Sequence, residues 1–93
     1  MDAALRELTA WAADSRGELF LVAYHARAIL RDQGGHYQAA LTLEIRTMAV
    51  LRGGGDQARR DLLDHTAALR GLLRDRELHQ LLDRLTYLVT TGA

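Results

Sequence analysis

The 93-residue sequence predicts an all-α fold of four to five antiparallel helices, arranged as a helical bundle or as stacked helical hairpins, in one domain spanning residues 1–93. Strong helix formers (Leu, Ala, Arg, Glu, Gln and Met) make up more than half of the chain. Val and Ile, which favour strands, together number five. Apolar residues recur at intervals of three and four, which places them on one side of a helix. The chain lacks Pro, and its short Gly-containing breaks are typical of helical hairpins.

The first two predicted helices cover residues 2–14 and 16–33. The second follows an S-x-x-E capping box that runs from Ser15 to Glu18, a pattern typical of a helix start. Each helix has one apolar stripe of the kind that faces a core. The stripe members are Leu5, Leu8, Trp11 and Ala12 in the first helix, and Leu19, Val22, Ala23, Ala26, Ile29 and Leu30 in the second.

The third predicted helix, residues 37–52, differs because it has two apolar stripes. One stripe consists of Leu41, Ile45 and Met48, and the other of Ala39, Leu43 and Val50. A helix with two apolar stripes is expected to pack on two sides. We therefore expect it to lie either in the middle of the domain or across a subunit interface.

The last two predicted helices cover residues 57–73 and 76–90. The triple glycine 53–55 precedes the first of them, and Asp56 is its expected N-cap. Asp75 lies where the leucine phase slips, so the region is either two helices or one kinked helix. The apolar stripes are Leu62, Thr66, Leu69 and Leu73, followed by Leu78, Leu81, Leu82, Leu85, Leu88 and Val89.

Two stretches of the sequence, 28–36 and 71–79, align at an offset of 43 residues. Four pairs of aligned positions hold the same residue in both stretches: Leu30 and Leu73, Arg31 and Arg74, Asp32 and Asp75, His36 and His79. A repeated helical hairpin of about 40 residues would produce this pattern. Chance in a chain rich in Leu, Arg and Asp would produce it equally well.

The first hairpin resembles a tetratricopeptide repeat over residues 19–52. The segment from Gly35 to Leu41, GHYQAAL, is similar to the Gly-x-Tyr-x-x-Ala-Leu that opens the second helix of that family. The sequence departs from the family in an extra Gly, in a missing closing Pro and in a period longer than 34 residues. The resemblance implies a module that binds a protein in a groove lined by the first helix of each pair. On the matching repeat it places Tyr24 and Arg31 toward the partner.

The four histidines and the acidic residues do not form a pattern typical of catalysis or metal binding. Asp61 and His65 are spaced as one ligand pair, but the sequence has no Glu-x-x-His and no Cys. The triple glycine is followed by Asp56 rather than Lys-Ser or Lys-Thr, so it does not predict a phosphate-binding loop. We expect no enzyme activity, no metal, no cofactor and no small-molecule substrate.

The charges are evenly distributed, with 12 Arg and 12 acidic residues. Arg exceeds the acids by one in residues 57–93, where opposite signs alternate as on a solvated helix face. No apolar run is long enough to cross a membrane, and no secretory signal is visible, so we expect a cytoplasmic protein without a membrane partner.

These observations predict a non-catalytic adaptor or regulatory module that binds a protein partner or a second copy of itself, as a dimer. The alternative is a transcription-linked regulator that contacts nucleic acid through the Arg-rich last two helices.

Overall fold

The computed structural model describes residues 15–91 as four α-helices, with no strand within that range. The helices are α2 (Ser15–Asp32), α3 (Tyr37–Leu51), α4 (Gly55–Leu69) and α5 (Arg76–Thr90). The all-α prediction is therefore confirmed. The helix predicted for residues 2–14 lies outside the described residues.

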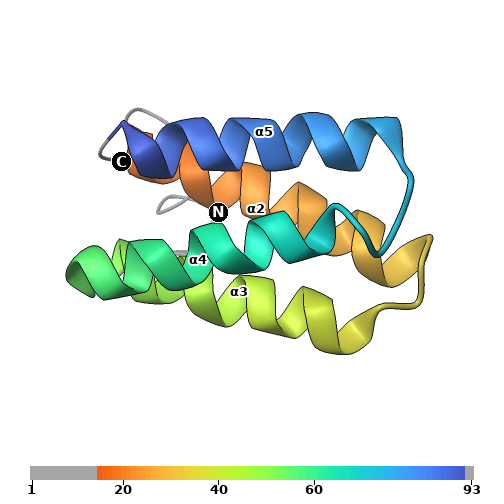
Figure 1. The fold of residues 1–93 in the computed structure, drawn as a ribbon, viewed down its shortest axis with the longest axis horizontal. Helices are drawn as coiled ribbons and strands as arrows, with labels where there is room; N and C mark the ends of the chain where they lie inside the picture. The colour runs from red at the N-terminus through yellow and green to blue at the C-terminus, as the bar shows by residue number, and fades with distance from the viewer. Residues whose placement is uncertain (1–14, 92–93) are drawn as a thin grey trace, which may run out of the picture.

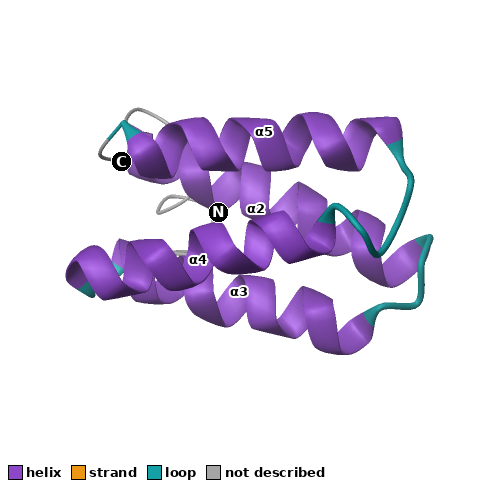
Figure 2. Cartoon of the chain, viewed as in Figure 1, coloured by secondary structure: helices purple, strands orange, loops and turns teal. Residues whose placement is uncertain are grey.

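The four helices form an up-and-down bundle in which neighbours along the chain run antiparallel (Figure 1). α2 contacts α3 and α5, and α4 contacts the same two helices. In the diagonal pairs, α2 with α4 and α3 with α5, no two Cα atoms lie within 8 Å of each other. The helices therefore form a closed ring around one core, and the connecting segments lie at the two ends of the bundle (Figure 2).

Glycine ends the first two helices of the bundle. Gly35 has φ +65°, and its N–H donates to the carbonyl of Arg31, as in a left-handed helix cap. Gly53 has φ +80° and begins a Schellman-type ending, in which the N–H of Gly54 donates to the carbonyl of Ala49. Residues other than glycine rarely adopt these φ values, so the glycines set the positions of both turns.

The sequence left open whether the region after Gly55 forms two helices or one kinked helix. The structure has two separate helices there. Asp75 is the N-cap of α5, and its side chain accepts a hydrogen bond of 2.9 Å from the N–H of Leu78. The prediction that Asp56 caps α4 is wrong, since Gly54 occupies the cap and Asp56 lies in the first turn. α4 also ends at Leu69, four residues before the predicted end.

The core is apolar and draws on all four helices. Its fully buried leucines exclude water from the centre of the ring, and their burial is the main favourable contribution to folding. The side chains with no exposed surface are Leu19, Ala26, Leu30, Leu43, Leu62, Leu69, Leu78, Leu82 and Leu85.

The prediction that the third helix lies in the middle of the domain is wrong. α3 contacts only α2 and α4, so it is one of four equivalent positions in the ring. Its inner stripe is buried through Leu43 and Val50, whereas Leu41 and Ile45 of the other stripe are exposed. The remaining expectation, that the second stripe belongs to an interface, stays a prediction. None of the described helices is long and apolar enough to cross a membrane.

Candidate partner-binding surface

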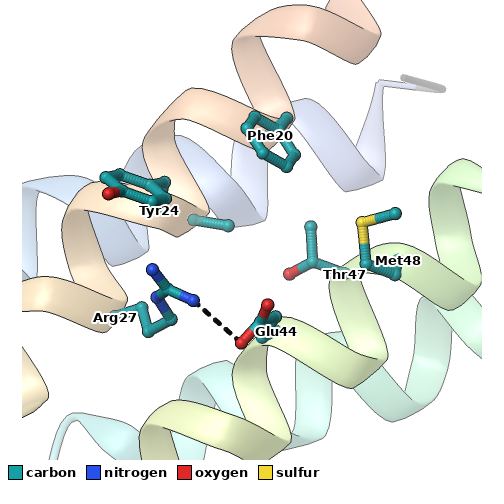
Figure 3. A pocket seen from close by; sticks show the side chains of 7 residues that line it. Phe20, Tyr24, Arg27, Glu44, Thr47 and Met48 are labelled. Carbon is teal, nitrogen blue, oxygen red and sulfur yellow. Dashed lines mark hydrogen bonds and ion pairs between the residues drawn. The ribbon is translucent and has the colours of Figure 1, made fainter. Parts of the chain in front are cut away.

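A pocket of about 110 Å³ lies between α2 and α3 on the outside of the bundle. Phe20, Tyr24 and Arg27 on α2 face Glu44, Thr47 and Met48 on α3 across it (Figure 3). Ala23 completes the lining. The antiparallel pairing of the two helices produces this arrangement, because it sets the middle of α2 against the middle of α3.

Stacked polar and aromatic groups form the α2 side of the pocket. The rings of Phe20 and Tyr24 stack with centroids 6.4 Å apart and planes inclined by 25°. The guanidinium carbon of Arg27 lies 4.7 Å from the centroid of the Tyr24 ring, within the range of a cation–π contact. Arg27 also donates a 2.9 Å hydrogen bond to the Glu44 carboxylate on α3. These contacts hold the Arg27 side chain across the boundary between the two helices.

Two buried polar atoms at the pocket have no hydrogen-bond partner. They are the hydroxyl oxygen of Thr47 and Nε of Arg27. Thr47 is 2% exposed, so its hydroxyl is almost fully removed from water. A buried polar group without a partner costs about 1–3 kcal/mol, and such groups are rare in native structures. These two buried atoms therefore reduce the stability of the fold at the pocket.

The second apolar stripe of α3 extends the pocket into an exposed ridge. Tyr37, Leu41 and Ile45 lie four residues apart on one side of the helix. They are 66%, 52% and 59% exposed. Met48 connects this ridge with the pocket, because it belongs to the same predicted stripe and also lines the pocket. We call the combined area the α2–α3 surface; it consists of Phe20, Tyr24, Arg27, Arg31, Tyr37, Leu41, Ile45 and Met48.

Both residues placed toward a partner by sequence reasoning are exposed on α2. Tyr24 lines the pocket, and Arg31 lies two helical turns further along the same side. Arg31 pairs with the adjacent Asp32 at 3.2 Å, with both side chains exposed. The tetratricopeptide resemblance implies a groove lined by the first helix of each pair. Here those helices, α2 and α4, lie diagonally across the bundle, and Tyr24 instead lines a pocket shared with α3.

Sequence reasoning did not single out Phe20, Arg27, Glu44 and Thr47. One signal was available, since Phe20, Tyr24, Arg27 and Arg31 are spaced by four, three and four residues and therefore share a side of α2. No comparable signal identified Glu44 and Thr47, because their place depends on how α3 packs against α2.

The histidines on α4 and α5 have structural contacts. Nε2 of His65 lies 3.0 Å from the carbonyl oxygen of Ala39, and Nε2 of His79 lies 3.0 Å from that of Leu73. Among residues 15–91, no group of three or more His, Asp or Glu side chains could hold a metal ion. Asp61 is instead hydrogen-bonded to the side chain of Gln57 at 2.9 Å.

The Arg-rich region of α4 and α5 is interrupted by acids. Arg70 pairs with Asp83 on α5, and Arg84 pairs with Glu18 on α2. The hydrogen bond from Arg84 is the main reason that the pKa of Glu18 lies below its ordinary value; burial opposes this shift, and the attraction between the two charges adds to it. The same bond raises the pKa of Arg84. At least two of the arginines are thus engaged within the bundle.

Comparison with protein families, curated proteins and solved structures found no match for this chain.

Proposed function

We propose that the protein is a small helical interaction module that binds a protein partner, or a second copy of itself, through the α2–α3 surface. The observation that carries this proposal is the exposed ridge of Tyr37, Leu41 and Ile45 beside the pocket. Scattered exposed apolar residues are normal, but contiguous apolar areas on a small domain are typical of interaction sites.

The composition of the surface supports a protein as the partner. Aromatic residues, Met and Arg are enriched in protein interfaces, and all three occur here. Tyr24 and Arg27 form a preorganised pair at the centre, which reduces the side-chain entropy lost on binding. A pocket of this size suits one apolar side chain, since an engineered cavity of about 150 Å³ holds benzene.

The alternative, nucleic-acid binding through α4 and α5, has less support from the arrangement of charges. A nucleic-acid surface needs cations that are available to phosphates. Asp83 and Glu18 already engage Arg70 and Arg84. We therefore place the binding function on α2 and α3.

Substitution of Ile45 tests the proposal. The variant Ile45→Arg puts a charge in the ridge, and Leu72→Arg is its control, because Leu72 is similarly exposed at 45% but lies in the connection between α4 and α5. Both variants, with the wild type, are used for affinity capture from cell extract and for sedimentation equilibrium.

We expect wild type and Leu72→Arg to retain the same protein partner or the same dimer, and Ile45→Arg to lose it. Loss of binding in the control alone would contradict the proposed surface. Capture of nucleic acid by all three proteins, without a protein partner or a dimer, would favour the alternative function.

A further inference from the structure

α3 carries fewer charged residues than any other described helix. It has two, Glu44 and Arg46, whereas α2 and α4 have five each and α5 has four. Both charges of α3 are engaged within the bundle. Glu44 accepts a hydrogen bond from Arg27 on α2, and Arg46 donates one to the backbone carbonyl of Asp61 on α4. The outward side of α3 is therefore free of unpaired charge, as the core of a protein interface usually is.

The residues on this side of α3 are self-complementary. Tyr37, Leu41, Ile45, Met48 and Arg52 follow one another at intervals of four, four, three and four residues, so they share a side of the helix. Tyr37 and Arg52 lie equally far, along the chain, from the point between residues 44 and 45. Leu41 and Met48 are also equally far from that point, and Ile45 lies beside it.

A two-fold axis through that point, perpendicular to α3, would set two copies of the helix antiparallel. Tyr37 of each copy would then face Arg52 of the other, and Leu41 would face Met48. Such reciprocal contacts are what a two-fold dimer requires, since the same patch of both subunits must fit itself. The Arg52 side chains of the two copies would lie at opposite ends of the contact, so like charges would not meet.

Tyr37 and Arg52 are both available for this contact. The other two tyrosines, Tyr24 and Tyr87, have the guanidinium carbon of an arginine 4.7 and 5.0 Å from their ring centroids. The side chains of Tyr37 and Arg52 are exposed, and within residues 15–91 they take part in no hydrogen bond, ion pair or ring contact. The antiparallel pair would give Tyr37 the cation–π contact that the other tyrosines already have.

This side of the bundle has the area that a stable dimer needs. From Tyr37 to Arg52 the helix extends about 22 Å, at a rise of about 1.5 Å per residue. A small stable interface takes about 600 Å² from each partner, which is about one tenth of the 5813 Å² of accessible surface on this chain. The α2–α3 surface lies on one of the four sides of the bundle, and the connecting segments lie at its ends (Figure 2). They leave this side open.

The same pairing supplies an occupant for the pocket between α2 and α3. Met48 lines the pocket, so a Leu41 that faces Met48 of the other copy lies at the mouth of that copy's pocket. The wall is mostly side-chain carbon from Phe20, Ala23 and Met48, and a leucine side chain needs no hydrogen-bond partner. The pocket volume of about 110 Å³ suits one side chain of this size.

We propose that two copies of the chain pair through α3, antiparallel across a two-fold axis near Ile45, with Leu41 of each copy at the pocket of the other. This inference rests on the proposed function, because it names a second copy as the partner of the α2–α3 surface.

Single cysteines can test the arrangement, because the chain has no Cys of its own. Ile45→Cys lies at the proposed axis, and Tyr37→Cys and Arg52→Cys lie at the two ends of the contact. Leu72→Cys is the control, since Leu72 is 45% exposed but lies in the connection between α4 and α5. Each purified variant is oxidised with copper phenanthroline, and covalent dimers are measured on a non-reducing gel. Circular dichroism checks that each variant is helical, and sedimentation equilibrium measures the wild type.

We expect the wild type to sediment as a dimer and Ile45→Cys to form far more covalent dimer than Leu72→Cys. Tyr37→Cys and Arg52→Cys, each oxidised alone, should stay at the level of the control. Their equivalent residues would lie about 22 Å apart in the antiparallel pair, whereas a disulfide needs Cα atoms within about 7 Å. An equal mixture of Tyr37→Cys and Arg52→Cys should form covalent dimers, because the two ends then meet.

A wild-type protein that sediments as a monomer at every concentration would overturn the proposal. Covalent dimers of Tyr37→Cys alone would also overturn it, since they would require parallel helices. Equal crosslinking of Leu72→Cys and Ile45→Cys would show random collision instead of a defined contact. These measurements use the pure protein, whereas the proposed function is tested by capture from cell extract. A monomer that still retains a partner through Ile45 would thus contradict this inference and leave the proposed function in place.

Discussion

α3 and α5 are both 15 residues long, yet they distribute their apolar side chains differently. The buried side of α5 is wholly apolar. Tyr87 is the only large apolar residue of this helix that is strongly exposed. On α3 the buried side includes the unpaired Thr47, and three large apolar residues are exposed. α5 also has a side-chain N-cap, from Asp75, whereas α3 has none.

The difference shows that α5 follows the rules for a stable helix more closely than α3 does. The buried leucines and the capped start of α5 both stabilise the bundle. α3 departs from those rules on both of its sides, by burying a hydroxyl and by exposing aliphatic residues. Departures of this kind concentrate at functional sites, where binding offsets a loss of stability. The comparison therefore supports the proposal that α3 forms part of a binding surface.

Two leucine truncations test the comparison most directly. Leu82 on α5 has no exposed surface, so Leu82→Ala should destabilise the protein by about 2–5 kcal/mol through lost burial and a residual cavity. Leu41 on α3 is 52% exposed, and Leu41→Ala should change stability by no more than about 0.5 kcal/mol. Urea denaturation midpoints measure both. Similar losses in the two variants would mean that Leu41 is covered as completely as Leu82, and the contrast between the helices would disappear.

Two neighbouring alanines test whether the inner side of α3 is as tightly packed as that of α5. Ala40 is 3% exposed, and Ala39 beside it is half-buried. Ala40→Leu should force helices apart at a typical overpacking cost of about 1–3 kcal/mol. We expect it to exceed the cost of Ala39→Leu by at least about 1 kcal/mol, within the same range. Equal denaturation midpoints would show that α3 is loosely packed on its inner side too.

The fold was largely predictable from the sequence, because propensity and the spacing of apolar residues are local properties. The glycines at 35 and 53 and the cap at Asp75 gave helix ends close to the observed ones. The end of α4 was harder to predict from the sequence. Leu73 continues the apolar phase of that helix, and it remains half-buried although it lies beyond the end of α4 at Leu69.

The candidate site was only partly predictable. The resemblance pointed to Tyr24 and Arg31, and both are exposed on α2. Periodicity showed that Leu41 and Ile45 share a side of α3, but it does not reveal what covers that side. The pocket depends on Glu44 and Thr47 meeting Arg27 and Phe20 from another helix, and such a pairing is a property of the tertiary structure.

The two buried threonines sharpen the comparison further. The hydroxyl of Thr66 on α4 donates a hydrogen bond of 2.8 Å to the carbonyl of Leu62, whereas the hydroxyl of Thr47 has no partner. Thr47→Val removes an unsatisfied polar atom and should stabilise the protein by about 1 kcal/mol. Thr66→Val removes a hydrogen bond and should destabilise it by about 1 kcal/mol. Thermal or urea unfolding of the pair decides this, and a loss of stability in Thr47→Val would mean that its hydroxyl is satisfied in solution.

The smallest effect concerns the ion pair that links α2 to α5, Glu18 with Arg84, in contrast with the Arg27–Glu44 pair that links α2 to α3. The hydrogen bond from Arg84 lowers the pKa of Glu18 in the folded protein below its ordinary value of 4.5. The pair therefore contributes stability above that ordinary value, and the contribution is lost as the pH falls through the lowered pKa of the folded state. The contribution is small because both side chains are at least 40% exposed and solvent screens their charges.

Glu18→Gln should accordingly unfold at a lower urea concentration than the wild type at neutral pH, and the difference should vanish in acid. Asp64→Asn is the matched control, because it removes the same charge from an exposed position on α4. For the control, the difference in unfolding urea concentration from the wild type should not shrink to a comparable degree as the pH falls. If the Glu18→Gln difference instead persists unchanged below the lowered pKa, the ionised pair does not hold α5 to α2. The stability of α5 would then come from its buried leucines alone, which would make its contrast with α3 sharper still.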